Sequence, residues 1–226
     1  MAHRSKRYEQ ALEQVDREKL YPLDEAVALL KSLAPAQFDE TIELAVQLGI
    51  DPKQSEQQVR TAITLPNGIG KSMHVVVFAE GEDAEQAREA GADEVGSDEM
   101  VERVEGGWTD FDVALATPPM MRKIGKLGRF LGPRGLMPTP KNGTVRPDIA
   151  EAVKEFKAGK VEMRNDDGGN VHCPVGKLSF SNEAIAENVR EAIEHLLRNK
   201  PIGVKGQYLG NVVLSSTMSP GVKIRV

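Results

Sequence analysis

The chain has 226 residues, 40% of them hydrophobic, a size that suits two domains with buried cores. A net charge of −5 argues against a uniformly basic nucleic-acid binder, and no apolar run approaches the length of a membrane span. The N-terminal ten residues lack the apolar stretch of a secretory signal, and the single cysteine, Cys173, excludes an internal disulfide, so we expect a cytoplasmic protein.

The first quarter of the chain is typical of a mixed α+β domain. Residues 3–18 and 24–34 have the pattern of helices, and Pro22 favours the start of the second. Hydrophobic residues then alternate over 38–50 and again over 59–65. This period of two predicts two strands, each with one buried face.

The middle of the chain follows a different pattern. Continuous apolar runs at 73–80 and 112–118, with a shorter one near Val95, predict strands buried on both faces. Helical segments lie between them, and strand–helix alternation of this kind predicts a parallel sheet with helices on both faces. A further helix is expected from Pro118, then an extended Gly/Pro-rich basic loop over 128–143 and a helix over 147–158.

The last third returns to alternation. Two strands are predicted around a turn at 166–169, and two more near 209–216 and 222–226. Between these pairs, residues 182–199 predict a helix with Asn182 as its cap. Its expected inner face consists of Ile185, Val189, Ile193, Leu196 and Leu197.

These elements predict an α/β chain of two domains. Residues 1–67 and 159–226 would form a discontinuous α+β outer domain, interrupted by an inserted Rossmann-like three-layer α/β domain at 68–158. An insertion requires two chain crossings between the domains. We therefore expect a hinge near residues 68–70 and 158–159.

Catalytic motifs are weak throughout the sequence. The segment from Asn67 to Ser72 resembles the end of a phosphate-binding P-loop, but Leu65 stands where the motif needs glycine. His172 and Cys173 are neighbours in a predicted strand, so their side chains point to opposite faces and cannot share a metal. We expect no enzyme activity, cofactor or metal; a nucleotide-dependent enzyme and a protein-only scaffold are the alternatives.

Charge is distributed unevenly along the chain. Residues 80–112 carry thirteen acids and two bases, whereas residues 122–146 carry seven bases and no acid. Clustering on solvated faces is the simpler interpretation of either stretch. Flexible glycines could equally leave Arg129, Arg134 and Lys141 available to RNA or tRNA phosphates.

Three segments have unusual sequences. They are GKLGRFLGPRGLMPTPKNGTV at 125–145, FDET at 38–41 and SSTMSPG at 215–221. Together with LGIDP, GWTDFD, EMRND and VHCPVGK, in that order, they closely resemble the bacterial form of the large-subunit ribosomal protein L-one family. The resemblance extends over essentially the whole chain.

The resemblance implies a structural RNA-binding protein, monomeric when free, with no membrane association. Its partners would be the ribosome, large-subunit ribosomal RNA at the mobile side stalk, exit-site tRNA and its own operon mRNA. It would assist release of deacylated tRNA from the exit site and repress translation of that mRNA.

The resemblance also places the RNA face on the outer domain. The residues carried over by position are Phe38, Glu40, Thr41, Arg164, His172, Thr217, Met218 and Ser219. From periodicity alone Phe38 is a core residue, and Thr217 with Met218 an ordinary turn. Gln37 and Ser219 depart from the Lys and Gly that the family often has, and the first change removes a phosphate contact.

Overall fold

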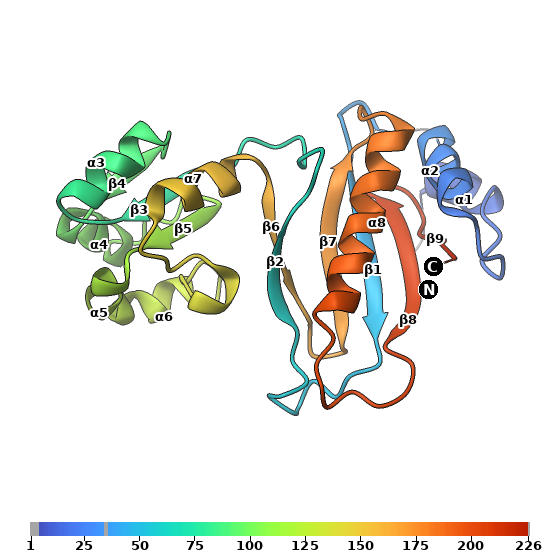
Figure 1. The fold of residues 1–226 in the computed structure, drawn as a ribbon. Coiled ribbons are helices and arrows are strands. Elements are labelled where there is room, and N and C mark those ends of the chain that lie inside the picture. Colours follow the sequence, from blue (N-terminus) through green and yellow to red (C-terminus); the bar gives the residue numbers. More distant parts are fainter. Residues whose placement is uncertain (1–4, 34–35, 226) are drawn as a thin grey trace. The chain divides into compact units, whose positions relative to one another are not determined.

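A computed structural model describes residues 5–33 and 36–225 (Figure 1). By its contacts the chain divides into a first unit, Met1–Gly70 with Val161–Val226, and a second unit, Lys71–Lys160. The chain thus passes between the units twice, at 70–71 and at 160–161. The parts of the predicted elements at residues 3, 4, 34 and 226 lie outside the described residues.

The first unit is built on a four-stranded antiparallel sheet with the strand order β7-β1-β8-β9. Its strands are β1 (Thr41–Leu48), β7 (Asn170–Lys177), β8 (Leu209–Ser216) and β9 (Val222–Lys223). In β1 the side chains of Ile42, Leu44, Val46 and Leu48 are buried. The predicted alternation is therefore confirmed, and it gives the sheet one core face.

Three helices belong to this unit: α1 (Lys6–Glu13), α2 (Leu23–Ser32) and α8 (Asn182–Arg198). Helix α8 lies over the sheet, as Figure 1 shows, and buries Ile185, Val189 and Leu196. Two details of the prediction are wrong. Ser181 caps α8 through its hydroxyl, which accepts from the Ala184 N–H at 3.1 Å, and Leu197 is 48% exposed.

Strands β2 (Arg60–Thr64) and β6 (Lys160–Arg164) pair with each other in a separate two-stranded sheet. The hairpin predicted between β6 and β7 is therefore reduced to one bridge, Asn165 to Val171. The cause is local: the Val59 N–H donates to Asn165 Oδ1 at 2.8 Å, and the Asn165 N–H donates to the Val59 oxygen at 3.1 Å. These bonds hold the end of β6 against β2.

The second unit contains a parallel sheet with the order β4-β3-β5. Its elements are β3 (Val75–Phe78), α3 (Glu82–Glu89), β4 (Glu94–Gly96), α4 (Asp98–Glu105), β5 (Val113–Ala116) and α7 (Ile149–Lys157). One hydrophobic cluster joins Val76 and Phe78 to α4, and another joins Val75 and Val77 to α3 and α7. The sheet is thus covered on both faces, as the apolar runs predict.

The segment after β5 differs from the prediction. A continuous helical run comprises η1 (Pro118–Met120), α5 (Met121–Ile124), η2 (Gly125–Leu127) and α6 (Gly128–Leu131), and η3 (Pro140–Asn142) follows later. The expected extended loop is therefore wrong for 128–131. Met120, Ile124, Leu127 and Leu131 recur every three or four residues and are buried, so a helix places all four in one core.

Candidate nucleic-acid interface

The predicted RNA residues at the ends of β1 and β8 meet at one edge of the first unit. The Thr41 N–H donates to Thr217 Oγ1 at 3.2 Å, and the Thr217 N–H donates to the Thr41 oxygen at 3.1 Å. Lys177 Nζ donates to Thr41 Oγ1 at 2.8 Å. Residues distant in sequence are thus joined into one surface. We call Phe38, Thr41, Thr217, Met218 and Ser219 the edge cluster.

Two large apolar side chains of the edge cluster face solvent. Phe38 is 54% exposed and Met218 is 45% exposed. The interpretation of Phe38 as a core residue is therefore wrong. Exposed side chains of this size, held by a hydrogen-bonded framework, suit contacts with a base or ribose.

Glu40 lies beneath the edge cluster rather than in it. The residue is 1% exposed, and its carboxylate accepts from the Ser216 hydroxyl at 2.6 Å and the Ala36 and Met218 N–H groups at 2.6 and 2.9 Å. Burial alone would raise its pKa, but these hydrogen bonds lower it below the usual value. Glu40 is therefore not exposed to RNA, which corrects its prediction as a contact residue. Instead, its carboxylate fixes the loops that carry Phe38 and Met218.

Ser219 supports the same loop. Its Oγ accepts from the Ser216 N–H at 2.9 Å, and its residue is half-buried. The serine therefore closes a tight turn after β8 while the neighbouring Thr217 and Met218 remain exposed. The turn that the sequence suggested is present, and it is tied to Glu40.

His172 and Arg164 lie apart from the edge cluster. His172 is exposed on the sheet, paired with Ala45 of β1, and its Nδ1 is 3.6 Å from Glu43 Oε1. Arg164 is exposed at the end of β6, in the other sheet. The sheet register places His172 on β7 beside β1, the strand that begins at Thr41. No contact among the described residues links Arg164 to the cluster.

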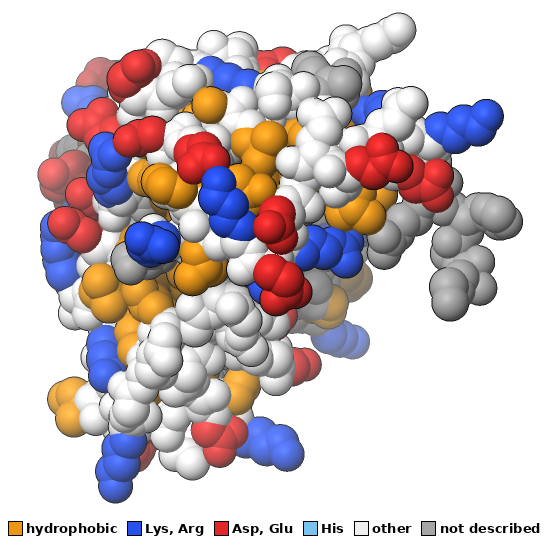
Figure 2. Space-filling view, turned by 90° about the vertical axis from the view of Figure 1, so that its right-hand side faces the viewer, with side chains coloured by type: hydrophobic (Ala, Val, Ile, Leu, Met, Phe, Trp, Pro, Cys, Tyr) orange, Lys and Arg blue, Asp and Glu red, His pale blue; other side chains and the backbone are white. Residues whose placement is uncertain are grey.

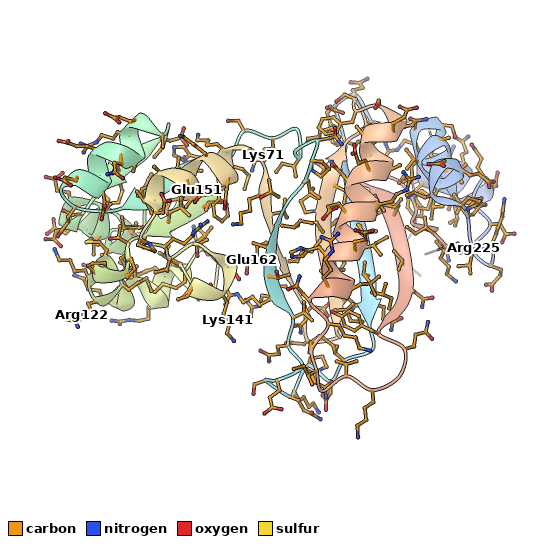
Figure 3. All side chains as sticks on the ribbon, in the orientation of Figure 1. Lys71, Arg122, Lys141, Glu151, Glu162 and Arg225 are labelled. Carbon is orange, nitrogen blue, oxygen red and sulfur yellow. The ribbon has the colours of Figure 1, made fainter. Side chains whose placement is uncertain are left out.

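The basic stretch of the second unit separates into paired and unpaired side chains. Lys123 contacts Glu80 and Asp98, Lys126 contacts Glu105, and Arg134 donates to Thr109 Oγ1. Within the described residues, four exposed cations here have no ion pair: Arg122, Arg129, Arg134 and Lys141. Of these, Arg134 is held by its hydrogen bond to Thr109. Figure 3 shows Arg122 and Lys141 extending outward from their unit.

The segment that resembles a P-loop has a different role. Lys71 Nζ donates to Asp112 Oδ1 at 2.5 Å, and the His74 N–H donates to Asp112 Oδ2 at 3.0 Å. Burial alone would raise the pKa of Asp112, but these two hydrogen bonds lower it below its usual value. The lysine thus fixes the start of the parallel sheet.

Cys173, the single cysteine, is buried. Burial raises the pKa of the Cys173 thiol to about 12, so its thiolate is not available as a nucleophile. Among the described residues, no group of three or more His, Cys, Asp or Glu side chains could hold a metal, and no helix could cross a membrane.

Comparison with known proteins identifies the family. The pattern that defines the ribosomal protein L1p/L10e family matches residues 30–220. The chain belongs to this family. A curated relative, the large ribosomal subunit protein uL1 of Kosmotoga olearia, is 56% identical over 224 residues, which cover 99% of this chain and 97% of the relative. The resemblance drawn from the sequence segments is confirmed.

The geometry shows two supporting residues that the sequence did not reveal. Lys177 and Ser216, which hold Thr41 and Glu40, were not among the predicted site residues. Lys177 closes the segment VHCPVGK that carries part of the family resemblance, but nothing local to it indicates a partner 136 residues away. Their roles follow only from strand pairing.

Proposed function

We propose that this chain is a structural protein of the large ribosomal subunit that binds ribosomal RNA at the mobile side stalk through the edge cluster. The observation that carries the proposal is the exposed pair Phe38 and Met218, held on a framework of buried hydrogen bonds to Glu40. A preformed surface avoids the ordering cost that flexible loops bear on binding. Family membership supports RNA as the partner.

Recognition by shape agrees with the charge of the first unit. On the face that Figure 2 shows, Lys and Arg side chains are interspersed with Asp and Glu side chains. Lys19 pairs with Glu25 and Arg190 with Asp24. Affinity should therefore depend on fit and on 2′-hydroxyl contacts to folded RNA more than on counterion release.

The proposal includes two further roles, one in tRNA release and one in translational repression. Exit-site tRNA would be released with help from this protein, and the second unit's Arg129 and Lys141 are available for secondary RNA contacts. The chain would also repress its own operon mRNA, because an RNA that imitates the stalk fits the same surface. It would act on ribosomes in the cytoplasm and need no cofactor.

The stalk RNA itself provides the test. Purified protein is titrated into the side-stalk RNA element and into a scrambled hairpin of equal length, and Kd is measured by filter binding. We expect preference for the stalk element of at least a hundredfold, in line with specific over non-specific recognition. Equal affinity for both RNAs would contradict the proposal.

A further inference from the structure

In the part of the chain that the structure describes, no helix covers one face of the first unit's four-stranded sheet. Thr41, Glu43, Ala45 and Gln47 alternate with the buried residues of β1, and each is half-buried or exposed. Helices α2 and α8 contact β8 and β7 from the side of the core. The opposite side of the same strands is therefore a surface, which we call the open face.

The open face contains two adjoining hollows. One, of about 520 Å³, is lined by Leu20, Gln47, Gln207, Asn211, Lys223 and Arg225, among others. The second, of about 300 Å³, is lined in part by Ala45, His172 and Val213. Because Gln47 and Asn211 line both, the two hollows form one groove across β1 and β8.

The charge of the groove is suited to an anion. Lys223 and Arg225 stand at its β9 end, and neither forms an ion pair with any described residue. None of the described residues that line either hollow is an acid. The acid on β1's open side, Glu43, lies next to His172. In a chain with a net charge of −5, such a surface is unusual.

The side-chain amides of Gln47 and Asn211 in the groove can each donate and accept hydrogen bonds. Asn211 Nδ2 donates to Gln47 Oε1 at 3.0 Å, which fixes the orientation of both side chains. Both residues are exposed, and this bond leaves the Gln47 amide N–H groups and Asn211 Oδ1 free to bind a ligand. A ribose 2′-hydroxyl both donates and accepts, so it matches this pair.

The groove continues the edge cluster along the same strands. Thr41 and Gln47 are separated by six steps along the strand, or about 20 Å at the usual rise. Across from them, β8 runs from Asn211 to Ser216, directly before Thr217. A strand of RNA that contacts the edge cluster can therefore extend into the groove without leaving the sheet.

We propose that this groove is a second RNA subsite, which holds the sugar–phosphate backbone of the same RNA that the edge cluster binds. Lys223 and Arg225 would contact phosphates, and Gln47 with Asn211 a ribose hydroxyl. The subsite rests on the proposed function of the edge cluster. It supplies a local electrostatic contribution that the net charge of the chain conceals.

The test is a salt titration of stalk-RNA binding by the full chain. The double variant Lys223→Ala/Arg225→Ala should bind about five- to tenfold more weakly at moderate salt. The slope of log affinity against log salt should fall by about 1.5 to 2, because two phosphate contacts are lost. Variant Gln47→Ala should weaken binding and leave the slope unchanged.

A matched control carries the same change of charge elsewhere. Arg88 in α3 and Lys154 in α7 are exposed and have no ion pair among the described residues, so Arg88→Ala/Lys154→Ala removes one Arg and one Lys. If both double variants show the same affinity and slope, the subsite is refuted while stalk preference still supports the edge cluster. If the wild type shows no preference, the proposed function itself fails.

A tethered cleavage probe gives an independent result. Cys173 is buried and is the chain's single cysteine, so Gln207→Cys at the rim of the groove adds one reactive thiol. An iron chelate at this thiol should cut stalk RNA within the bound complex, and the same chelate at Arg88→Cys should not cut those nucleotides. The proposal would be overturned if the chelate at position 207 produced no cleavage. It would also be overturned if Lys223 and Arg225 were needed for dimerisation of the free protein, because the groove would then be a protein interface.

Discussion

At the scale of single residues, the edge cluster depends on side chains that act on backbone groups far away in sequence. Thr217 and Thr41 bind each other's main chains across a separation of 176 residues. The hydroxyl of Thr217 also lies on an exposed turn. The Thr217 hydroxyl is therefore bonded to the Thr41 main chain and is also accessible to RNA.

Replacing Thr217 with Ala tests the hydroxyl. We expect stalk-RNA binding to weaken by about 1 kcal/mol, or roughly fivefold in Kd, because one hydrogen bond is lost. The free energy of unfolding should change little, since the freed Thr41 N–H is near water. Thr217→Ser keeps the hydroxyl and should bind like the wild type; equal binding by the Ala variant would place the contact elsewhere.

Glu40 provides a prediction about pH. Its pKa is lowered in the folded protein, so its stabilising effect is complete above its usual value of 4.5 and is lost as the pH falls through the folded value. Glu40→Gln should lower the free energy of unfolding at pH 7 by about 1–3 kcal/mol, because two charge-assisted bonds are lost. The difference from the wild type should shrink below pH 4.

Urea unfolding at pH 7 and at pH 3 measures that difference. Glu43→Gln is the control, since Glu43 is an exposed carboxylate on β1, the strand that directly follows Glu40. A Glu40→Gln deficit that is the same at both pH values would show that the carboxylate charge is unimportant. The burial of Glu40 was not predictable from FDET, because its partner Ser216 enters through strand pairing.

At the scale of elements, periodicity predicted the fold wherever it was strong. The alternation of β1, the apolar runs of β3 and β5 and the amphipathic pattern of α8 each produced the predicted element. The prediction failed where local composition opposed tertiary packing. Gly128 and Gly132 suggest a loop, yet the buried Leu131 extends the helical run through residues 128–131.

Leu127→Ala tests that helical run. Removing a fully buried leucine should destabilise the second unit by about 2–5 kcal/mol. Trp108, the single tryptophan, packs against the same core, so its fluorescence during urea unfolding reports this unit. Phe130→Ala is the control, because Phe130 is 40% exposed on the same run and its loss should cost much less.

At the scale of the whole molecule, the chain divides between two units that it crosses twice. The inserted arrangement was expected from the return of alternation after Gly159, a position with a positive φ of 101°. The hinge expected near these crossings stays a prediction. The assignment of RNA binding to the first unit likewise remains a proposal, and deletion of the second unit addresses it.

A chain in which a short Gly/Ser linker replaces residues 71–160, the second unit, should keep most of its stalk-RNA affinity, within about fivefold. The physical reason is that the edge cluster and its supporting hydrogen bonds all lie in the first unit. Filter binding measures Kd, and circular dichroism checks that the shortened protein is folded. A folded product with hundredfold weaker binding would assign the main contacts to the second unit.

The central claim is that RNA docks on the exposed apolar pair of the edge cluster. Its most direct measurement is the Kd of Phe38→Ala/Met218→Ala for the stalk RNA, set against Leu197→Ala/Ile202→Ala, which also removes two exposed apolar side chains from the first unit. Loss of these contacts should weaken the first variant by roughly 2–3 kcal/mol, about thirty- to a hundred-and-fiftyfold. The second variant should bind like the wild type. Equal affinity of both folded variants would contradict the account.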